Sequence, residues 1–338
     1  MQVHFIDSHD VTAFGDWFAV LRATDEERWP DMAGWDYDTA KAMADLEGAM
    51  SFLCLAATDP SGATVGIGAL QVPNWENRHQ VMLDVRVLPG HRRQHIGSAI
   101  VEEVERWALA AGRSVIHGES QIPVTALASD GSAPFAEHLG FIPVQAANRR
   151  HLALPIDPAA IAPLREEVAA ATVGYRCRAF TTPWPKQYME DQFELQRRMS
   201  TDAPSGDPQN EEQVWNAERV QEVDDLMVAQ GIVKMAAVAE HLASGRLVAF
   251  TELAIPVSRQ TEAWQWATLV LGEHRGHRLG LAVKLANLDY LSATFPTVRY
   301  IVTGNAAENA PMIAVNEMLG FKVAANEMLW EKHVAPTQ

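Results

Sequence analysis

The sequence contains few cysteines, and the two it has are not arranged for a disulfide framework. Cys54 and Cys177 are the only thiols in 338 residues, and each lies within an apolar alternating stretch. Such cysteines are typical of small buried side chains in a reducing compartment. They exclude a disulfide-stapled fold and a cysteine-based metal site, and we expect the protein to bind no metal.

Basic residues are also scarce. Asp and Glu outnumber Lys and Arg by 43 to 27, which gives a formal net charge of −16. A nucleic-acid-binding protein needs a basic surface to neutralise phosphates, and no Lys/Arg-rich tract of that size is present. The charge argues against a nucleic-acid partner and is compatible with a cationic small molecule.

Long apolar runs are absent as well. The opening residues, MQVHFIDSHD, have neither the basic nor the apolar segment of a secretion signal, and no run of about 18 apolar residues occurs. We therefore expect a cytoplasmic protein without a membrane partner. A chain of 338 residues, 48% of them apolar, is long enough for two domains with a core each.

The chain repeats itself. GATVGIGALQVP (62–73) and GRLVAFTELAIP (245–256) share a pattern, and HRRQHIG (91–97) and HRGHRLG (274–280) keep the same offset. Further on, HLGFIPV (138–144) corresponds to MLGFKVA at nearly that offset. Three landmarks in one register predict a duplicated domain. We predict a first domain at 1–155, a partly helical linker at 156–173 and a second domain at 174–338.

Both halves show the same order of predicted elements. An alternating strand opens each half, and two helical stretches follow it, which are residues 10–26 and 37–47 in the first half and 185–199 and 211–230 in the second. Three strands then lead into the basic turn, and a helix, a strand, a helix and a closing hairpin at Gly-Phe complete the unit. This order predicts an α+β fold in which each domain is a mixed, mostly antiparallel sheet flanked by helices.

The basic turns suggest an anion site. A strand that ends in a turn and opens a helix presents unpaired backbone N–H groups at the positive end of the helix. Arg275 and Arg278, or Arg92 and Arg93, would add charge-assisted contacts, so a pyrophosphate fits this setting. The alternative is a solvated turn with arginines that cap the helix, but two occurrences in register favour a binding role.

The turns and their surroundings resemble a known family. HRGHRLGLAVKLANL (274–288) with NAAENAPMIAVNEMLGF (305–321) resembles the acyl-CoA-binding half of the GNAT superfamily of N-acyltransferases. LPGHRRQHIGSAIVEEVERWA (88–108) with HLGF resembles the same segment in the first copy. The tandem arrangement is similar to that of actinobacterial tandem GNAT proteins and, more distantly, of mycothiol synthase. The family has Gly where His95 and Arg278 stand, so both loops depart from its pattern.

The resemblance implies acetyl-CoA or another acyl-CoA as co-substrate and assigns its binding residues. In the second copy, strand backbone would pair with the pantetheine arm, the loop would hold the pyrophosphate, and two asparagines would approach the arm or thioester: Leu269, Val270, Leu271, Arg275, Gly276, His277, Arg278, Leu279, Gly280, Asn305 and Asn309. The first copy offers Val85, Val87, Arg92, Arg93, Gln94, His95, Ile96 and Gly97 for the same tasks. It lacks the asparagine pair, so we favour the second copy as the acyl-CoA binder.

Acyl transfer also needs acid–base groups. Family members often place a Tyr acid four residues before the Gly-Phe pair, where this chain has Asn316 and Ala136, which do not titrate. As catalytic candidates we take Asn316, at that position, and two strand carboxylates, Glu252 and Asp84. The alternative for Glu252 is a solvent-facing or Arg-paired side chain, and for Asp84 a pairing near Arg86. Two further residues, His117 and Glu119, remain open as candidates.

Two functions follow from these features. The first is an acyl-CoA-dependent N-acyltransferase, acetyl in the first instance, that acts on an amine of a small metabolite as a monomer or homodimer. The second is a catalytically degenerate acyl-CoA sensor or partner protein, which the missing tyrosines favour. The acceptor and the acyl group are not encoded in any recognisable motif.

Overall fold

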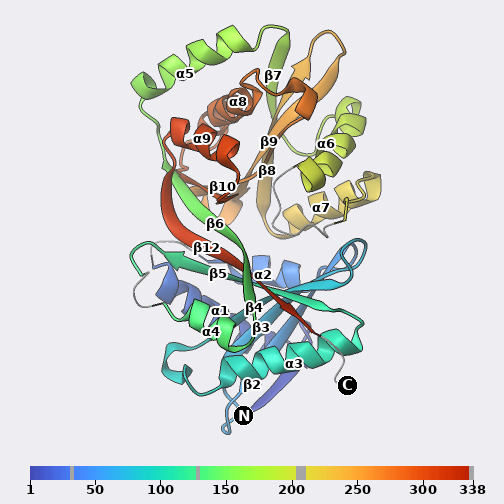
Figure 1. The fold of residues 1–338 in the computed structure, drawn as a ribbon, viewed down its shortest axis with the longest axis vertical. Coiled ribbons are helices and arrows are strands. Elements are labelled where there is room, and N and C mark those ends of the chain that lie inside the picture. Colours follow the sequence, from blue (N-terminus) through green and yellow to red (C-terminus); the bar gives the residue numbers. More distant parts are fainter. Residues whose placement is uncertain (31–33, 127–129, 203–210, 335–338) are drawn as a thin grey trace. The chain divides into compact units, whose positions relative to one another are not determined.

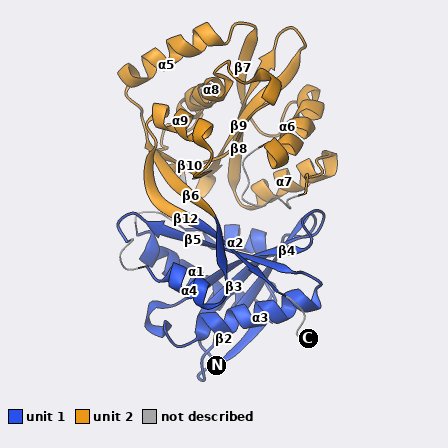
Figure 2. Cartoon of the chain, viewed as in Figure 1, with its two compact units in different colours: residues 1–144, 328–338 blue, residues 145–327 orange. Residues whose placement is uncertain are grey.

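A computed structural model of the chain describes residues 1–30, 34–126, 130–202 and 211–334 (Figure 1). Two compact units make up the chain, one of residues 1–144 with 328–338 and one of residues 145–327 (Figure 2). These units are defined by packing, whereas the predicted boundaries at 155 and 174 follow the repeat in the sequence and stay a prediction. The difference arises at two long strands described below.

The first unit is a mostly antiparallel sheet with helices on both faces. Its strands follow the order β1 (Gln2–Ile6), β2 (Met50–Thr58), β3 (Thr64–Pro73), β4 (Gln80–Val87) and β5 (Val115–Pro123). All neighbours are antiparallel except β4 and β5. One face packs against α1 (Val11–Arg28) and α2 (Tyr37–Ala44), and the other against α3 (Ile96–Ala110) and α4 (Ser132–His138).

The second unit repeats this plan. Its strands β7 (Tyr175–Thr181), β8 (Ile232–His241), β9 (Arg246–Pro256) and β10 (Glu262–Val270) are antiparallel neighbours, and β11 (Tyr300–Ala306) lies parallel to β10. The flanking helices are α6 (Met189–Asp202), α7 (Ala217–Ala229), α8 (Leu279–Thr294) and α9 (Ala310–Leu319). Alternation along β9 explains the two faces, because Leu253 packs with residues of α8 while Ala254 packs with Met227 of α7. The predicted α+β class with two similar domains is confirmed.

Two long strands join the units. The end of β6 (Ile142–Ala153) pairs with β11, and its Leu152 lies in the core of the second unit. The end of β12 (Lys322–His333) neighbours β5, and its Trp330 lies in the core of the first unit. Each strand therefore begins in one unit and ends in the other. The predicted closing hairpins are wrong, because Gly320 (φ 94°) ends helix α9 and the chain continues as one strand.

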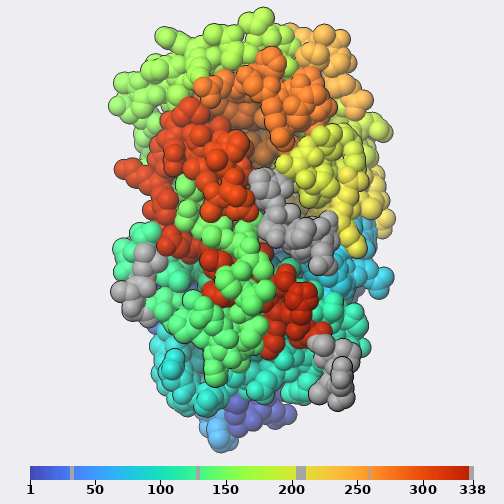
Figure 3. Space-filling view, in the orientation of Figure 1, coloured from blue at the N-terminus to red at the C-terminus, as the bar shows by residue number. Residues whose placement is uncertain are grey.

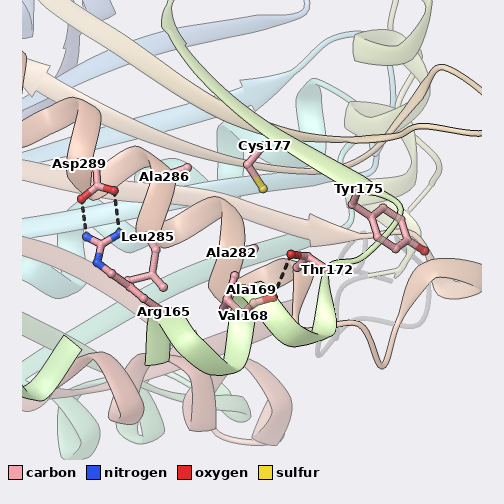
Figure 4. Close-up of a pocket in the computed structure, with 10 residues that line it drawn as sticks. All are labelled: Arg165, Val168, Ala169, Thr172, Tyr175, Cys177, Ala282, Leu285, Ala286 and Asp289. Carbon is pink, nitrogen blue, oxygen red and sulfur yellow. Dashed lines mark hydrogen bonds and ion pairs between the residues drawn. The ribbon is translucent and has the colours of Figure 1, made fainter. Parts of the chain in front are cut away.

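The linker forms a helix, as the sequence indicated for part of it. Helix α5 (Pro158–Ala171) packs Ile161, Leu164 and Val168 against the core beside α8. None of its residues is fully buried, and Figure 3 shows it at the surface of the second unit. A pocket of about 240 Å³ lies between α5 and α8 (Figure 4), where Arg165 holds Asp289 with distances of 2.8 and 2.5 Å. In the described residues, no helix is long and apolar enough to cross a membrane.

Candidate acyl-CoA site

Both basic turns form the same structure. A short 3-10 turn (Pro89–His91 or Gly272–His274) follows the strand, and a left-handed residue precedes the helix, His95 (φ 61°) or Arg278 (φ 54°). Neither of these residues caps its helix with a side-chain hydrogen bond. The first-turn N–H groups of α3 and α8 are thus not taken by a capping side chain, as an anion site requires.

The first arginine of each turn ties the loop to its strand. Arg92 Nε donates to the carbonyl of Val87 at 3.1 Å, and Arg275 Nε donates to that of Val270 at 3.3 Å. The two arginines differ in their remaining nitrogens. The Arg92 guanidinium forms a bidentate ion pair with Glu27 of α1, whereas Arg275 has no ion pair among the described residues. Each loop therefore pairs one of its two arginines, Arg92 or Arg278, and leaves the other, Arg93 or Arg275, without an ion pair among the described residues.

In both units the two parallel strands separate below the loop. Pairing of β4 with β5 ends at Leu83, and pairing of β10 with β11 ends at Gln265, in the described part of the chain. The strand backbone between these points and the loops therefore has no paired strand on that side among the described residues. This unpaired stretch of backbone, which we call the slot, includes the predicted pantetheine-pairing positions 85 and 87, and 269 to 271.

A β-bulge lies between β9 and β10, and the described residues of the equivalent pair in the first unit, β3 and β4, have none. The register between β9 and β10 shifts between Gln265 and Thr268, whereas the corresponding register of β3 and β4 is continuous. The buried amide of Gln265 fixes the bulge, since its Nε2 lies 2.7 Å from the Glu252 carbonyl and 3.3 Å from that of Ala267. Bulges are frequent next to active sites because they redirect backbone groups. The bulge was not predicted from the sequence, although a polar glutamine within the strand EAWQWATLV marks the place where it begins.

The helix-start glycines have different surroundings in the two units. A methyl group on Gly97 would come within 2.9 Å of the Phe135 ring, which lies over the helix start, while one on Gly280 would meet only Val270, at 3.7 Å. Trp330 adds a second ring to the first unit and donates to Ser120 at 2.9 Å. The repeat offset in this part of the chain is 180 positions. The residue that corresponds to Phe135 is therefore Val315, and the one that corresponds to Trp330 is Arg150. Among the described residues, an aromatic ring therefore lies beside the helix-start glycine of the first unit but not beside that of the second.

Comparison with known proteins identifies the family. Residues 15–141 match the model described as the Acetyltransferase (GNAT) family. A solved tandem GNAT protein from the clavulanic acid biosynthesis pathway is 25% identical, with a TM-score of 0.79, and the match covers 100% of this chain and 99% of that one. The first copy matches the GNAT family, and the chain over its full length has the fold of a tandem GNAT protein. The predicted resemblance, including the tandem arrangement, is confirmed.

Two further structures share the GNAT fold at lower identity. A GCN5-related N-acetyltransferase from Sphaerobacter thermophilus is 16% identical, with a TM-score of 0.68 and coverage of 100% and 96% of the two chains. A fungal GCN5-related glucosamine N-acetyltransferase region is 14% identical with a TM-score of 0.67, and covers 98% of this chain and 38% of that one. No curated protein is significantly similar to the sequence. GNAT enzymes are acetyltransferases, so the general activity is N-acetyl transfer from acyl-CoA to an amine.

Three asparagines near the second loop, Asn305, Asn309 and Asn316, have different environments. Asn316 is fully buried, and its Nδ2 donates to Asn305 Oδ1 at 2.7 Å, while its own Oδ1 has no partner among the described atoms. Asn309 accepts from the Met312 N–H at 3.3 Å and caps helix α9. The structure therefore brings the predicted site residues Asn305 and Asn316 together, while Asn309 serves as a helix cap.

Glu252 lies in a buried polar cluster on the α6–α7 face. Only 4% of it is exposed, and its Oε1 lies 3.5 Å from Lys234 Nζ and 3.4 Å from Gln196 Nε2. Lys234 also lies 3.8 Å from Asp224, whose pKa is raised by burial and by Glu252 against the opposing effect of the lysine. The expected alternatives, a solvent-facing or Arg-paired carboxylate, are wrong because helices cover the strand and a lysine is the partner.

The first-copy candidates have structural partners. Asp84 accepts from Arg86 Nε at 2.7 Å, and Arg86 also pairs with Asp25 of α1, as the alternative reading anticipated. His117 lies 3.1 Å from Glu331 in the first unit. Glu119 accepts from Gln121 at 2.9 Å. Each first-copy candidate thus has a polar partner within the first unit.

The cysteines do no chemistry at this site. Burial raises the pKa of the Cys54 thiol to about 12 and that of Cys177 to about 11, so neither forms a thiolate near neutral pH. Within the described residues, no group of three or more His, Cys, Asp or Glu side chains is arranged to hold a metal ion.

Proposed function

We propose that the protein transfers an acetyl or related acyl group from CoA to an amine of a small metabolite, with acyl-CoA bound by the second copy. The observation that carries this proposal is the contrast between the slots, since Phe135 lies over Gly97 while Gly280 has room around it. The β-bulge at Gln265 supports the same choice.

Each part of acyl-CoA has a counterpart in the second unit. The N–H groups of the α8 start, with Arg275, suit the pyrophosphate, and a charge-assisted contact of this kind contributes about 1.5–3 kcal/mol. The backbone at 269 to 271 suits the amides of the pantetheine arm. The bulge between Gln265 and Thr268 lies farther along the same strand and suits the thioester carbonyl. Arg278, which occupies the position where the family has Gly, forms an ion pair with Glu167, with 2.5 Å between its Nη2 and Oε1 of the glutamate.

The acceptor side is the α6–α7 face. Gln265 contacts the carbonyl of Glu252, whose carboxylate belongs to the cluster with Lys234 and Asp224. Two carboxylates against one lysine leave a net negative charge there, which favours a cationic amine and gives Glu252 the position of a proton acceptor. The tandem protein of the clavulanic acid pathway is a relative from small-molecule biosynthesis, which agrees with a metabolite as acceptor.

The family model matches the first copy rather than the second. Such a match depends on the whole apolar pattern of the domain, and the first copy keeps that pattern in its core: Val101, Val104 and Phe141 are all buried. Ligand access depends instead on the few side chains that line the slot. Our assignment to the second copy therefore depends mainly on Phe135, whose ring lies beside Gly97 in the first copy.

A second candidate function is an acyl-CoA sensor without turnover. Asn316 and Ala136 favour it, because both occupy the position of the family's Tyr acid. Calorimetry with CoA, followed by mixing with acetyl-CoA and a panel of amines while thiol release is measured, separates the two functions. CoA binding with thiol release by an amine supports the transferase. CoA binding without release by any amine would support the sensor.

A further inference from the structure

Three histidines gather around Tyr175 at the edge of the second loop. Tyr175 begins β7 and His241 ends β8, while His274 and His277 belong to the loop itself. The ring centroids of His241 and His274 lie 4.9 Å apart. The ring centroid of Tyr175 lies 5.3 Å from that of His241 and 5.2 Å from that of His277. We call these four residues the histidine cluster.

Most ring nitrogens of the histidine cluster are available to a ligand. The Tyr175 hydroxyl lies 3.0 Å from His274 Nδ1, and His241 Nδ1 lies 2.9 Å from Ser244 Oγ. Among the described residues, the Nε2 atoms of His241 and His274 and both ring nitrogens of His277 have no hydrogen bond. His277 is exposed and the other three residues of the cluster are half-buried, so a ligand can reach them from solvent.

The first copy does not repeat the cluster. From the strand register and the 183-residue offset of the loops, the counterparts of its four residues are Gln2, Thr58, His91 and Gln94. Only the histidine of the 3-10 turn is therefore shared by the two copies. The strands β1 and β2 pair without such a cluster, so the fold does not require it and a ligand-binding role accounts for it better.

The charged groups around the cluster leave it without a contacting carboxylate. Those on the neighbouring elements form three ion pairs: Arg176 of β7 with Glu240 of β8, Arg246 of β9 with Asp191 of α6, and Arg278 of the loop with Glu167 of α5. Glu273 interacts electrostatically with Arg198 of α6. Arg275, which lies between His274 and His277 in the sequence, has no ion pair within the described residues. A bound anion would thus meet imidazoles and a guanidinium.

We propose that the histidine cluster is a second phosphate site, which binds the phosphate on the ribose of CoA. This inference rests on the assignment of acyl-CoA to the second copy in the proposed function. The pyrophosphate and the ribose phosphate belong to the same end of CoA, so a pyrophosphate at the start of α8 brings the third phosphate close to the residues around the loop. Imidazole N–H groups and a tyrosine hydroxyl donate to phosphate oxygens. Within the described residues these imidazoles form no metal site, which leaves an anion as the ligand.

Histidines at this place make ligand binding depend on pH. An imidazole changes its charge between about pH 5 and 8, and a neighbouring phosphate favours its charged form. Binding of the phosphate should therefore draw protons onto the cluster, and CoA should bind more weakly as the pH rises from about 6 to 8. Arginines at the same positions would hold a phosphate without this dependence, because they stay charged throughout that range.

The test compares CoA with dephospho-CoA, which lacks only the ribose phosphate, by calorimetry. The wild type should bind CoA about ten- to a hundredfold more tightly, as expected for a charge-assisted contact. The double variant His241→Thr/His277→Gln carries the residues of the first copy and should lose this preference. Its affinity for dephospho-CoA should equal that of the wild type, which shows that the variant is folded and its loop intact. His9→Gln, which changes an exposed histidine of the first unit, is the matched control and should keep the preference.

Equal affinities of the wild type for CoA and dephospho-CoA, or a preference that survives in the double variant, would overturn the inference. Inorganic phosphate is the probe for a free anion. If it binds only when the two histidines are present, while CoA and dephospho-CoA bind equally, the cluster takes free phosphate and its assignment to CoA is wrong. If the wild type binds CoA but acylates no amine, the transferase proposal fails and the comparison of the two ligands alone decides on the cluster. No CoA binding by the wild type refutes both.

A second measurement counts the protons taken up. Calorimetry in two buffers of different ionisation enthalpy gives this number for each ligand. At about pH 7.5 a phosphate monoester already carries nearly two negative charges, so it releases few protons when it binds. The wild type should then take up more protons with CoA than with dephospho-CoA, and the double variant should show no difference. Equal uptake with the two ligands in the wild type would refute a histidine-based phosphate site.

Discussion

The amide of Asn316 donates to Asn305 Oδ1 at 2.7 Å, which links helix α9 to the end of strand β11 beside the second slot. Because Asn316 is fully buried, this contact holds the two elements at the point where the strands separate. Asn305→Ala would leave the buried amide without its acceptor and should lower the free energy of unfolding by about 1–3 kcal/mol. Urea unfolding measures this, with Asn316→Ala and the double variant as controls. Additive effects of the two changes would contradict a direct coupling.

Removal of the loop arginines should separate the two copies. Arg275→Ala should weaken CoA binding by about 1.5–3 kcal/mol, or roughly ten- to a hundredfold, since a charge-assisted contact is lost. Arg92→Ala should leave CoA affinity unchanged, because its guanidinium is already paired with Glu27. Calorimetry with CoA gives both values. A larger loss for Arg92→Ala would mean that the first copy is the binder.

The helix-start glycines should respond in opposite ways. Gly280→Ala has space for the methyl group in the folded protein, so stability should hold while CoA affinity falls, because the methyl blocks close approach of the phosphate to the backbone. Gly97→Ala would push against Phe135 and should cost about 1–3 kcal/mol of stability without an effect on CoA. Thermal unfolding and calorimetry on both variants test this crossed pattern, and parallel changes in the two variants would argue against it.

The bulge in β10 should depend on Gln265. Gln265→Leu removes hydrogen bonds to the carbonyls of Glu252 and Ala267, and we expect a loss of about 1–3 kcal/mol in stability together with a lower kcat. The matched control is the opposite substitution in the first copy. There Leu83 occupies the position equivalent to Gln265, and the register of β3 and β4 is continuous. Leu83→Gln should therefore reduce stability but not kcat. An unaltered kcat in Gln265→Leu would remove the bulge from the proposed site.

Lys284 should make stability depend on pH. Its pKa is about 7 in the folded protein, below the 10.5 of an exposed lysine, so between these values the unfolded chain binds a proton that the folded chain does not. Stability from this group therefore rises as the pH increases from 7 to 10.5 and is lowest below 7. Lys284→Met should be more stable than the wild type near pH 7, by on the order of a few kcal/mol, and the gain should shrink toward pH 10.5. Chemical unfolding at several pH values measures it, and a gain independent of pH would be inconsistent with a buried neutral lysine.

Much of the fold was predictable because the repeat, the alternating strands and the basic turns are local patterns. The turns at Arg92 and Arg275 share a 3-10 turn and an arginine hydrogen bond to the carbonyl of the preceding strand, as their similar sequences indicated. The exchange of β6 and β12 was not predictable, because the alternation of a strand does not specify which of two similar sheets it joins. Periodicity marks positions 284 and 287 as core, and the presence of Lys and Asn there is interpretable only once their surroundings are known.

The candidate site was predicted in outline rather than in detail. The loop residues and Asn305 could be assigned by resemblance, but the ring of Phe135, which lies beside Gly97, belongs to a helix distant from it in sequence. Trp330 lies in the first core, because the last strand crosses into that unit. Such long-range packing has no local signature in a single sequence.

The two long strands also bear on how this duplication has persisted. A gene shortened to either copy would lose one edge of a sheet, since β5 has β12 as its neighbour and β11 has β6. Each half-protein would then expose an unpaired strand, which promotes aggregation. Neither copy can be deleted without cost to the other, even if only one of them carries out the chemistry. A copy that carries out no chemistry would thus be free to diverge at its loop while selection on solubility retains it as a permanent folding partner.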